Sequence, residues 1–394
     1  MTREAQADLQ LRDAADVFSV LVQRLDHDVL QLASSRATVR LCVADGASCD
    51  VRITADTAQI LPTLTRQPDA TLTADLHTWR TIAEDLANGM AAFQQGRLHV
   101  RGNLHVGIGF LAASGRAPAA WRLRFLQTRT AFGNVSTMVG GRGAPLLLIH
   151  GLGATKASFI STVAALGDSH RCIALDLPGF GDSDKPLFAA YDARYFSKWC
   201  QALLDAFEIE RADLVGHSLG GRVAIEVGLQ HPERVGRLVL MMPSLAWRRN
   251  REWATLLTLV RPELGMLQFT PRPVVERILS WLLPDSGNGW VAAAKDEFLR
   301  SFVTPAGRAA FYAAARNIYL EQPHGPTGFW SRLSELQPPS LFIWGRRDGV
   351  VPIAFRRHVA VVLPESQHVE LDCGHVPQLE RPREVHNAIR RFLS

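Results

Sequence analysis

Short apolar runs alternate with helical patterns through much of the chain after residue 125. Runs such as 146–149 are continuously apolar, which is typical of strands buried on both faces of a sheet. We predict strands at 125–131, 135–139, 145–150, 172–176, 212–215, 237–242 and 340–344, and helices at 195–207, 222–230 and 353–363. This alternation predicts an α/β domain with a doubly wound, mostly parallel sheet covered by helices on both sides.

The first 115 residues have a different pattern and predict a smaller α+β domain. Apolar positions at helical spacing run from 8 to 32. Alternating runs at 39–43 and 51–54 flank Asp45-Gly46, which predicts a hairpin. Strands at 69–75 and 96–103 and a helix at 76–86 follow. The small residues after Ser114 predict a linker at 116–124, which gives domains at 1–115 and 125–394.

Between about 244 and 336 the strand pattern stops and helical patterns rich in bulky side chains replace it. We interpret this segment as a helical cap inserted into the sheet domain, with most of its large side chains in the cap core and a few lining an acyl pocket. These side chains are Trp247, Trp253, Leu256, Leu259, Phe269, Trp281, Trp290, Phe298, Phe302, Phe311, Tyr312 and Tyr319.

Composition narrows the class of protein. Of 394 residues 47% are hydrophobic and 21% charged, which is ordinary for a globular chain. No apolar run reaches about 18 residues, so we expect no membrane span. The polar N-terminus and five scattered cysteines favour a reduced, cytoplasmic setting.

The net charge of +5 is modest, and no nucleic-acid-binding motif accompanies it. A basic cluster at 248–251 is interpreted as a solvated face, with contact to anionic lipid head groups as the alternative. We therefore expect no nucleic-acid partner and leave peripheral membrane contact open. The oligomeric state is not predicted.

The sequence Gly216-His217-Ser218-Leu219-Gly220 follows a predicted strand and matches the G-x-S-x-G pattern of a sharp strand-to-helix turn. Such a turn exposes the serine hydroxyl, which becomes a nucleophile only when a base removes its proton. We interpret His217 as a structural neighbour of this serine.

An acid and a base follow the serine in chain order. Asp348 comes after the strand at 340–344, and His375 comes after the apolar run at 369–371. We predict that Ser218 attacks a carbonyl, that His375 transfers the proton, and that Asp348 orients the imidazole. Asp372 is a rival acid, but it stands too close to His375 in the chain to reach the far ring nitrogen.

A negative oxygen that forms in such a reaction requires two prepared N–H donors. We assign these to the backbone amides of Leu219 and of Leu152, in the turn 150–153. A phosphate-binding loop at 151–156 is excluded because Thr155, not glycine, precedes Lys156.

Residues 125–394 resemble the α/β-hydrolase fold family through 150–153, Asp176-Leu177-Pro178-Gly179-Phe180-Gly181-Asp182-Ser183, the Ser218 turn, 345–348 and 374–377. The resemblance implies that fold, a Ser-His-Asp triad, and no cofactor or metal. Serine at position 218 argues against the branches of this family whose nucleophile is a carboxylate.

Residues 15–113 resemble sterol-carrier-protein-2 lipid-binding domains through Asp69-Ala70-Thr71-Leu72-Thr73, Trp79, Ala91-Ala92-Phe93 and the run 96–102. The family usually has aspartate where this chain has Asn103. The resemblance implies binding of lipid or acyl chains; the alternative is a docking or dimerisation domain.

These patterns together predict an esterase or lipase-like serine hydrolase of apolar acyl esters or lipids. Cleavage of carbon–carbon bonds or lactones and perhydrolysis use the same triad and remain alternatives. A lipid carrier without catalysis is the hypothesis from another class.

Overall fold

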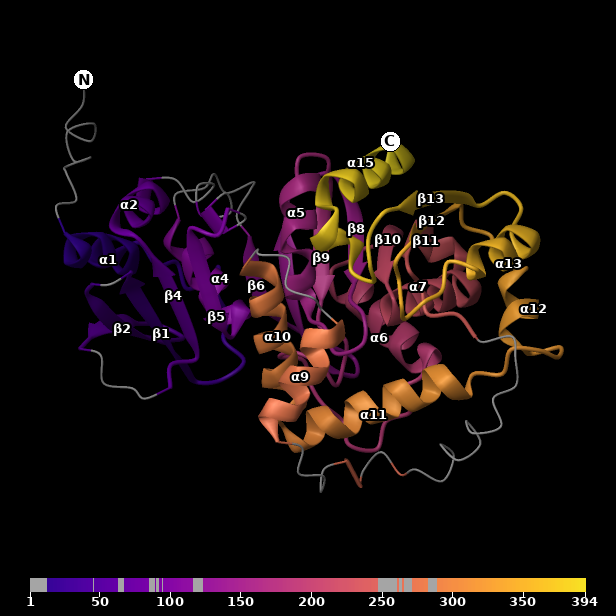
Figure 1. Cartoon of the computed structure of the whole chain (residues 1–394), viewed down its shortest axis with the longest axis horizontal. Helices are drawn as coiled ribbons and strands as arrows, with labels where there is room; N and C mark the ends of the chain where they lie inside the picture. The colour runs from indigo at the N-terminus through magenta and orange to yellow at the C-terminus, as the bar shows by residue number, and fades with distance from the viewer. Residues whose placement is uncertain are drawn as a thin grey trace. The chain divides into compact units, whose positions relative to one another are not determined.

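The computed structural model describes residues 13–44, 46–62, 67–84, 89, 92–93, 95–115, 123–246, 261, 264–265, 271–282 and 289–394. The chain forms two compact units, one of Met1–Phe125 with Leu283–Asp296 and one of Leu126–Leu282 with Glu297–Ser394 (Figure 1). Most of the predicted linker, residues 116–122, lies outside the described residues, as does the basic cluster at 248–251.

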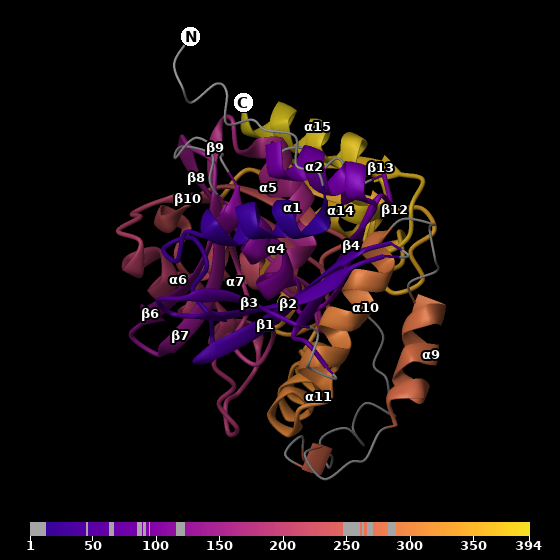
Figure 2. The same ribbon diagram turned by 90° about the vertical axis from the view of Figure 1, so that its left-hand side faces the viewer.

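The first unit contains a five-stranded sheet of order β3-β2-β1-β4-β5. β1 and β4 pair in parallel and the other pairs are antiparallel. The helices α1, α2 and α4 gather on one side of this sheet (Figure 2). The elements are α1 (Ala14–Gln23), β1 (Arg36–Val43), β2 (Ser48–Thr54), β3 (Ala58–Leu61), β4 (Ala70–Ala74), α2 (Leu76–Glu84), β5 (Leu98–Gly102) and α4 (Leu104–Ser114). The predicted hairpin, both later strands and the helix after β4 are therefore present.

Three elements of this unit differ from the prediction. The first helix ends at Gln23, and Asp26 Oδ1 then accepts the N–H of Asp28 at 3.0 Å, a local turn that competes with further helix. β3 is short and half exposed, so it has no alternating pattern. Helix α4 is buried nearly all round and lacks an amphipathic period. Asn103 begins it by accepting the N–H of Val106 at 3.2 Å.

The second unit is built on an eight-stranded sheet of order β13-β12-β11-β10-β8-β9-β7-β6. β7 runs antiparallel to β9, whereas the pairs from β9 through β13 are parallel. This confirms the predicted mostly parallel sheet. Its strands are β6 (Arg124–Thr130), β7 (Gly133–Gly140), β8 (Ala144–Ile149), β9 (His170–Leu175), β10 (Ala212–His217), β11 (Val235–Met241), β12 (Ser340–Gly345) and β13 (Gln367–Leu371).

Helices cover both faces of this sheet, as Figure 1 shows. α5 (Ile160–Leu166) and α15 (Pro382–Leu393) pack together on one face. α6 (Ala193–Ala206) and α7 (Leu219–Gln230) pack together on the other, with α7 against β8, β10 and β11. Two shorter helices, α13 (Phe355–Val362) and α14 (Pro377–Glu380), flank β13 in the sequence. The parallel strands thus bring their carboxyl ends to one edge, where turns can hold a site.

The segment predicted as a cap is helical in its described part, with α9 (Arg272–Leu282), α10 (Gly289–Phe302), α11 (Pro305–Leu320) and α12 (Phe329–Leu333). Its residues Leu283–Asp296 group with the first unit, and the rest of the described segment groups with the second. Its core includes Leu299 and Phe302, against which Phe298, Phe311 and Tyr312 pack. Trp247, Trp253, Leu256, Leu259 and Phe269 lie outside the described residues, as do the side chains of Trp281, Trp290 and Tyr319. Within the described ranges, none of the helices has both the length and the apolar character needed to cross a bilayer.

Candidate active site

Ser218 lies at the junction between β10 and α7 with φ 52° and ψ −115°. This left-handed backbone is uncommon for a residue with a side chain. The N–H of Ser218 donates to the carbonyl of Met241 on the neighbouring strand at 3.0 Å. Gly220 must lack a side chain because a Cβ there would overlap the carbonyl of Ile149. The predicted sharp turn is therefore present.

The structure brings the three predicted residues Ser218, His375 and Asp348 together. Ser218 Oγ is 3.0 Å from His375 Nε2, and His375 Nδ1 is 2.8 Å from Asp348 Oδ2. Because a carboxylate accepts, Nδ1 carries the proton and Nε2 is left to accept from the serine hydroxyl. Asp348 is fully buried, and its Oδ1 accepts the N–H groups of Val350 at 2.7 Å and Val351 at 3.0 Å.

The rival acid, Asp372, is placed elsewhere. Its side chain is 63% exposed and pairs with Arg347 Nε at 2.9 Å. Asp348 is therefore the carboxylate that reaches the imidazole.

The turn after β8 carries the amide of Leu152, one of the two predicted donors. Gly151 lies against Ser218, since a Cβ on it would be 3.2 Å from Ser218 Cβ. His150 Nδ1 donates to the carbonyl of Gly151 at 2.7 Å, and its Nε2 accepts from Leu177 N at 2.9 Å. In a trans peptide the N–H points opposite to the carbonyl, so His150 fixes the direction of the Leu152 N–H.

The second predicted donor, Leu219, is the first residue of α7. The first N–H groups of a helix lack partners within the helix, and the helix dipole adds positive potential there. Leu219 follows Ser218 directly in the chain, so its N–H lies in the serine turn, where the sequence predicts a donor.

His217 is buried beside the triad, and its Nε2 donates to the backbone carbonyl of His375 at 2.7 Å. Burial and the neighbouring His375 lower the pKa of His217 to about 3, so the ring is neutral near pH 7. His217 thus ties the serine turn to the loop of the base, in agreement with the structural role predicted for it.

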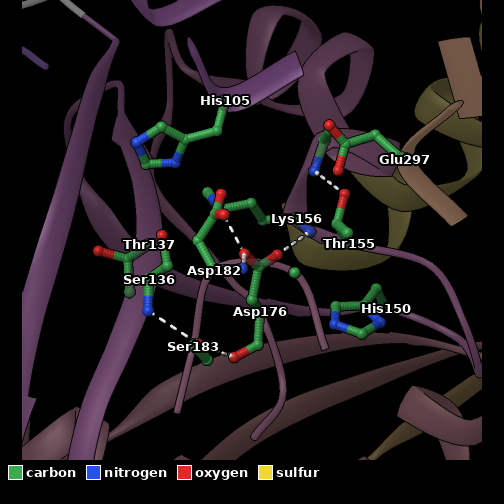
Figure 3. A network of polar contacts seen from close by, with 12 residues as sticks. His105, Ser136, Thr137, His150, Thr155, Lys156, Asp176, Asp182, Ser183 and Glu297 are labelled. Atoms are coloured by element: carbon green, nitrogen blue, oxygen red, sulfur yellow. Dashed lines mark hydrogen bonds and ion pairs between the residues drawn. The ribbon is translucent and has the colours of Figure 1, made fainter. Parts of the chain in front are cut away.

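A buried ionic network lies behind the turn after β8 (Figure 3). Lys156 Nζ is 2.6 Å from Asp176 Oδ2, and the Lys156 N–H donates to Asp176 Oδ1 at 2.7 Å. Burial opposes ionisation of Asp176, but Lys156 outweighs it and holds its pKa below the ordinary value. Arg300 of α10 extends the network to Asp182 at 2.6 Å and Glu297 at 3.0 Å.

Sequence reasoning overlooked His150 and Ser244 as parts of this site. Ser244 Oγ is 3.4 Å from Ser218 Oγ. His150 ends the predicted strand at 145–150 and Ser244 follows the predicted strand at 237–242, and the carboxyl ends of parallel strands meet at one edge. That position in the chain could have identified them.

In the described parts of the chain, no group of three or more His, Cys, Asp and Glu side chains is arranged to hold a metal ion. The groups assembled at Ser218 can instead perform nucleophilic chemistry.

Comparison with known proteins shows the families to which the two parts of the chain are similar. Residues 144–382 match the family described as alpha/beta hydrolase fold. The chain belongs to the alpha/beta hydrolase fold family. Its residues 3–110 match the SCP-2 sterol transfer family, so an SCP2 domain precedes the hydrolase domain.

Two relatives and one solved structure illustrate the range of this hydrolase family. 2-Hydroxymuconate semialdehyde hydrolase of Pseudomonas sp. strain CF600 is 31% identical over 269 residues, which cover 64% of this chain and 88% of that protein. The pimeloyl-[acyl-carrier protein] methyl ester esterase of Aeromonas hydrophila is 30% identical over 266 residues, which cover 66% of this chain and 99% of that protein. The crystal structure of a membrane phospholipase A, a bacterial virulence factor, matches at a TM-score of 0.57 and 27% identity. The match covers 69% of this chain and 86% of that one. This hydrolase family therefore includes members with different substrates.

The neutral buried His217 predicts a pH dependence of stability. Its pKa is lowered to about 3 in the folded chain and is ordinary, about 6.5, in the unfolded chain, so unfolding takes up a proton between these values. The free energy of unfolding should fall as the pH drops below 6.5, by about 2 kcal/mol at pH 5 from this group. Urea denaturation at pH 7, 6 and 5 should give a shallower fall for His217→Gln than for wild type. Equal slopes would contradict the prediction, and the exposed His99→Gln is the matched control.

The Lys156–Asp176 pair predicts a second effect on stability. Lys156→Met leaves a buried carboxylate without its cation and should lower the free energy of unfolding by about 3–5 kcal/mol. Adding Asp176→Asn removes the charge while keeping an acceptor oxygen for the backbone N–H groups. The double variant should therefore be more stable than Lys156→Met alone in urea denaturation. If the double variant loses as much free energy of unfolding as Lys156→Met and Asp176→Asn lose together when made singly, the two charges are not coupled.

Proposed function

We propose that this chain is a serine hydrolase that cleaves carboxylic esters of apolar acyl groups through an acyl-enzyme. The observation that carries the proposal is the chain of contacts from Ser218 Oγ to His375 Nε2 at 3.0 Å and from His375 Nδ1 to Asp348 Oδ2 at 2.8 Å. Nucleophile, base and orienting acid are within hydrogen-bond reach, as nucleophilic catalysis by serine requires.

In the acylation step Ser218 Oγ attacks the ester carbonyl carbon while its proton passes to His375 Nε2. The imidazolium that forms is stabilised by Asp348, which is buried and held by two backbone N–H groups. The carbonyl oxygen gains negative charge and accepts from the amides of Leu152 and Leu219. His375 then returns its proton to the alcohol, which leaves as the carbon–oxygen bond breaks.

In the deacylation step water replaces the alcohol. His375 Nε2 removes a proton from the water, whose oxygen attacks the acyl carbon. The bond between that carbon and Ser218 Oγ breaks, and the proton on His375 passes to Oγ. The carboxylic acid leaves, and the triad returns to its starting protonation state.

Three observations support an apolar acyl group. Phe298 and Phe311 of the cap pack against Gly153, next to the Leu152 amide. An SCP2 domain, from a sterol transfer family, precedes the hydrolase domain in the same chain. One relative is named as a methyl ester esterase and one structural neighbour as a phospholipase A.

Carbon–carbon bond hydrolysis is the second candidate function. It is favoured by the 31% identity to a protein named 2-hydroxymuconate semialdehyde hydrolase. A comparison of kcat/KM for p-nitrophenyl esters, lactones and vinylogous diketones separates the two functions, because the preferred class should exceed the others by orders of magnitude.

Removal of the nucleophile tests the proposal directly. Ser218→Ala should lower hydrolysis of p-nitrophenyl acyl esters by about a factor of 10⁴ or more, because no acyl-enzyme can form. Wild type should react covalently with a fluorophosphonate at Ser218, and the variant should not. Thermal unfolding of the variant checks that the fold is kept. Retention of wild-type turnover would refute the assignment, and a wild type that resists labelling would favour a carrier without catalysis.

The SCP2 domain predicts a dependence on acyl-chain length. If it captures or presents apolar substrate, deletion of residues 1–115 should lower kcat/KM for dodecanoyl esters more than for acetyl esters. The acetyl ester and fluorophosphonate labelling of Ser218 serve as controls for an intact hydrolase domain. Equal loss for both esters would instead support the docking role.

A further inference from the structure

Ser244 lies in the turn after β11, in contact with the nucleophile. Its hydroxyl oxygen is 3.4 Å from Ser218 Oγ, and its backbone N–H donates to the carbonyl of Ser218 at 3.0 Å. A hydroxyl therefore stands beside the reacting oxygen on a backbone that is itself bonded to the serine turn.

The turn is bent to reach this position. Met242 is buried and has φ 41°, in the left-handed region that side chains disfavour. Its N–H is held by the carbonyl of Ile343 at 2.9 Å. Strained backbone of this kind persists only where surrounding structure enforces it, and it clusters at functional sites.

The first turn of α7 makes room for the segment Met242-Pro243-Ser244. A Cβ on Gly221 would lie 2.8 Å from Pro243 Cβ, so the absence of a side chain there lets Pro243 approach the helix. Pro243 is buried, whereas Ser244 keeps partial exposure. The segment Met242-Pro243-Ser244 thus packs onto the serine turn from the side of β11.

The positions of the protons in the site determine which of the two hydroxyls, Ser218 or Ser244, donates to the other. Asp348 accepts from His375 Nδ1, so His375 Nε2 is an acceptor and takes the single proton of Ser218 Oγ. The hydroxyl of Ser244 must then donate to a lone pair of Ser218 Oγ. Its hydrogen bond stabilises electron density on that oxygen.

We propose that Ser244 is an additional catalytic residue that speeds release of Ser218 from the acyl-enzyme. In deacylation the bond from the acyl carbon to Ser218 Oγ breaks, its electron pair moves onto Oγ, and His375 returns a proton to the same atom. An ester oxygen is a weak acceptor, and an oxygen that gains charge is a strong one. The Ser244 hydrogen bond therefore strengthens as the transition state of deacylation is approached.

The acylation step gains less from this contact. Ser218 Oγ already accepts from Ser244 in the free enzyme, so the bond is present before the attack as well as during it. An interaction made equally in both states does not lower the barrier between them. The effect of Ser244 should fall on kcat for activated esters, whose acylation is fast, with little change in kcat/KM.

The test compares Ser244→Ala with Ser244→Thr and with Ser158→Ala in the full-length chain. Ser158 is equally part-exposed and follows the Leu152 turn, but its hydroxyl donates to the carbonyl of Thr155 at 2.9 Å. With p-nitrophenyl hexanoate, Ser244→Ala should lower kcat about 3- to 10-fold, the effect of one neutral hydrogen bond. KM should fall in parallel. Ser244→Thr keeps a hydroxyl and should restore much of kcat, and Ser158→Ala should match wild type.

Intact-mass spectrometry of the acyl adduct on Ser218 measures the step itself. The adduct should decay more slowly in Ser244→Ala, while the burst of p-nitrophenolate keeps its rate. An unchanged decay, or a loss of kcat/KM as large as the loss of kcat, would overturn the role of Ser244. This inference rests on the proposed function; a wild type that forms no adduct would overturn both, whereas an adduct with unchanged decay overturns the role of Ser244 alone.

Discussion

The arrangement of the site depends on the backbone turn at Ser218. A left-handed residue between a central strand and a helix costs of order 1–3 kcal/mol, and neighbouring bonds must hold it. The N–H of Ser218 donates to the carbonyl of Met241 on β11, and the carbonyl of Ser218 accepts from the backbone N–H groups of Arg222 and Ser244. On the side of the turn that faces β8, the close approach of Gly220 to the carbonyl of Ile149 fixes the backbone. The parallel sheet therefore sets the direction of the serine hydroxyl, and the base and donors are assembled around it.

The proposed reaction places one positive charge at a defined position in the site. His375 would become an imidazolium beside the buried carboxylate of Asp348, with the His217 ring 5.0 Å from its own ring. A second cation there would oppose that charge. Burial keeps His217 neutral, so its N–H can hold the carbonyl of His375 without competing for the proton. In the proposed reaction His375 transfers the proton, while His217 positions the loop that carries it.

The sheet, the helices between 244 and 336 and the proximity of Ser218, His375 and Asp348 could be predicted because each leaves a strong local pattern. Strands buried on both faces give continuous apolar runs, and the order of serine, acid and histidine follows from strand ends. The short, half-exposed β3 and the helix α4, apolar all round, have no such period and were missed. Ser244 and the role of His150 depend on strands that are distant in the sequence but adjacent in the sheet. Their contacts follow from register and backbone strain, which a single sequence does not encode locally.

The attachment of the cap bears on the apolar acyl substrate that we propose. Two largely buried ion pairs hold the cap. Arg300 of α10 pairs with Asp182. Glu321 after α11 pairs with Arg222 of α7, with Arg222 Nε 2.8 Å from Glu321 Oε2. Because these charges are paired with each other, they offer little attraction to a charged ligand. Two side chains of the cap segment that pack on Gly153, next to Leu152, are the aromatic rings of Phe298 and Phe311. An acyl group placed beside that turn, as in the proposed reaction, would contact these aromatic rings, and its transfer from water would be favourable if it is itself apolar.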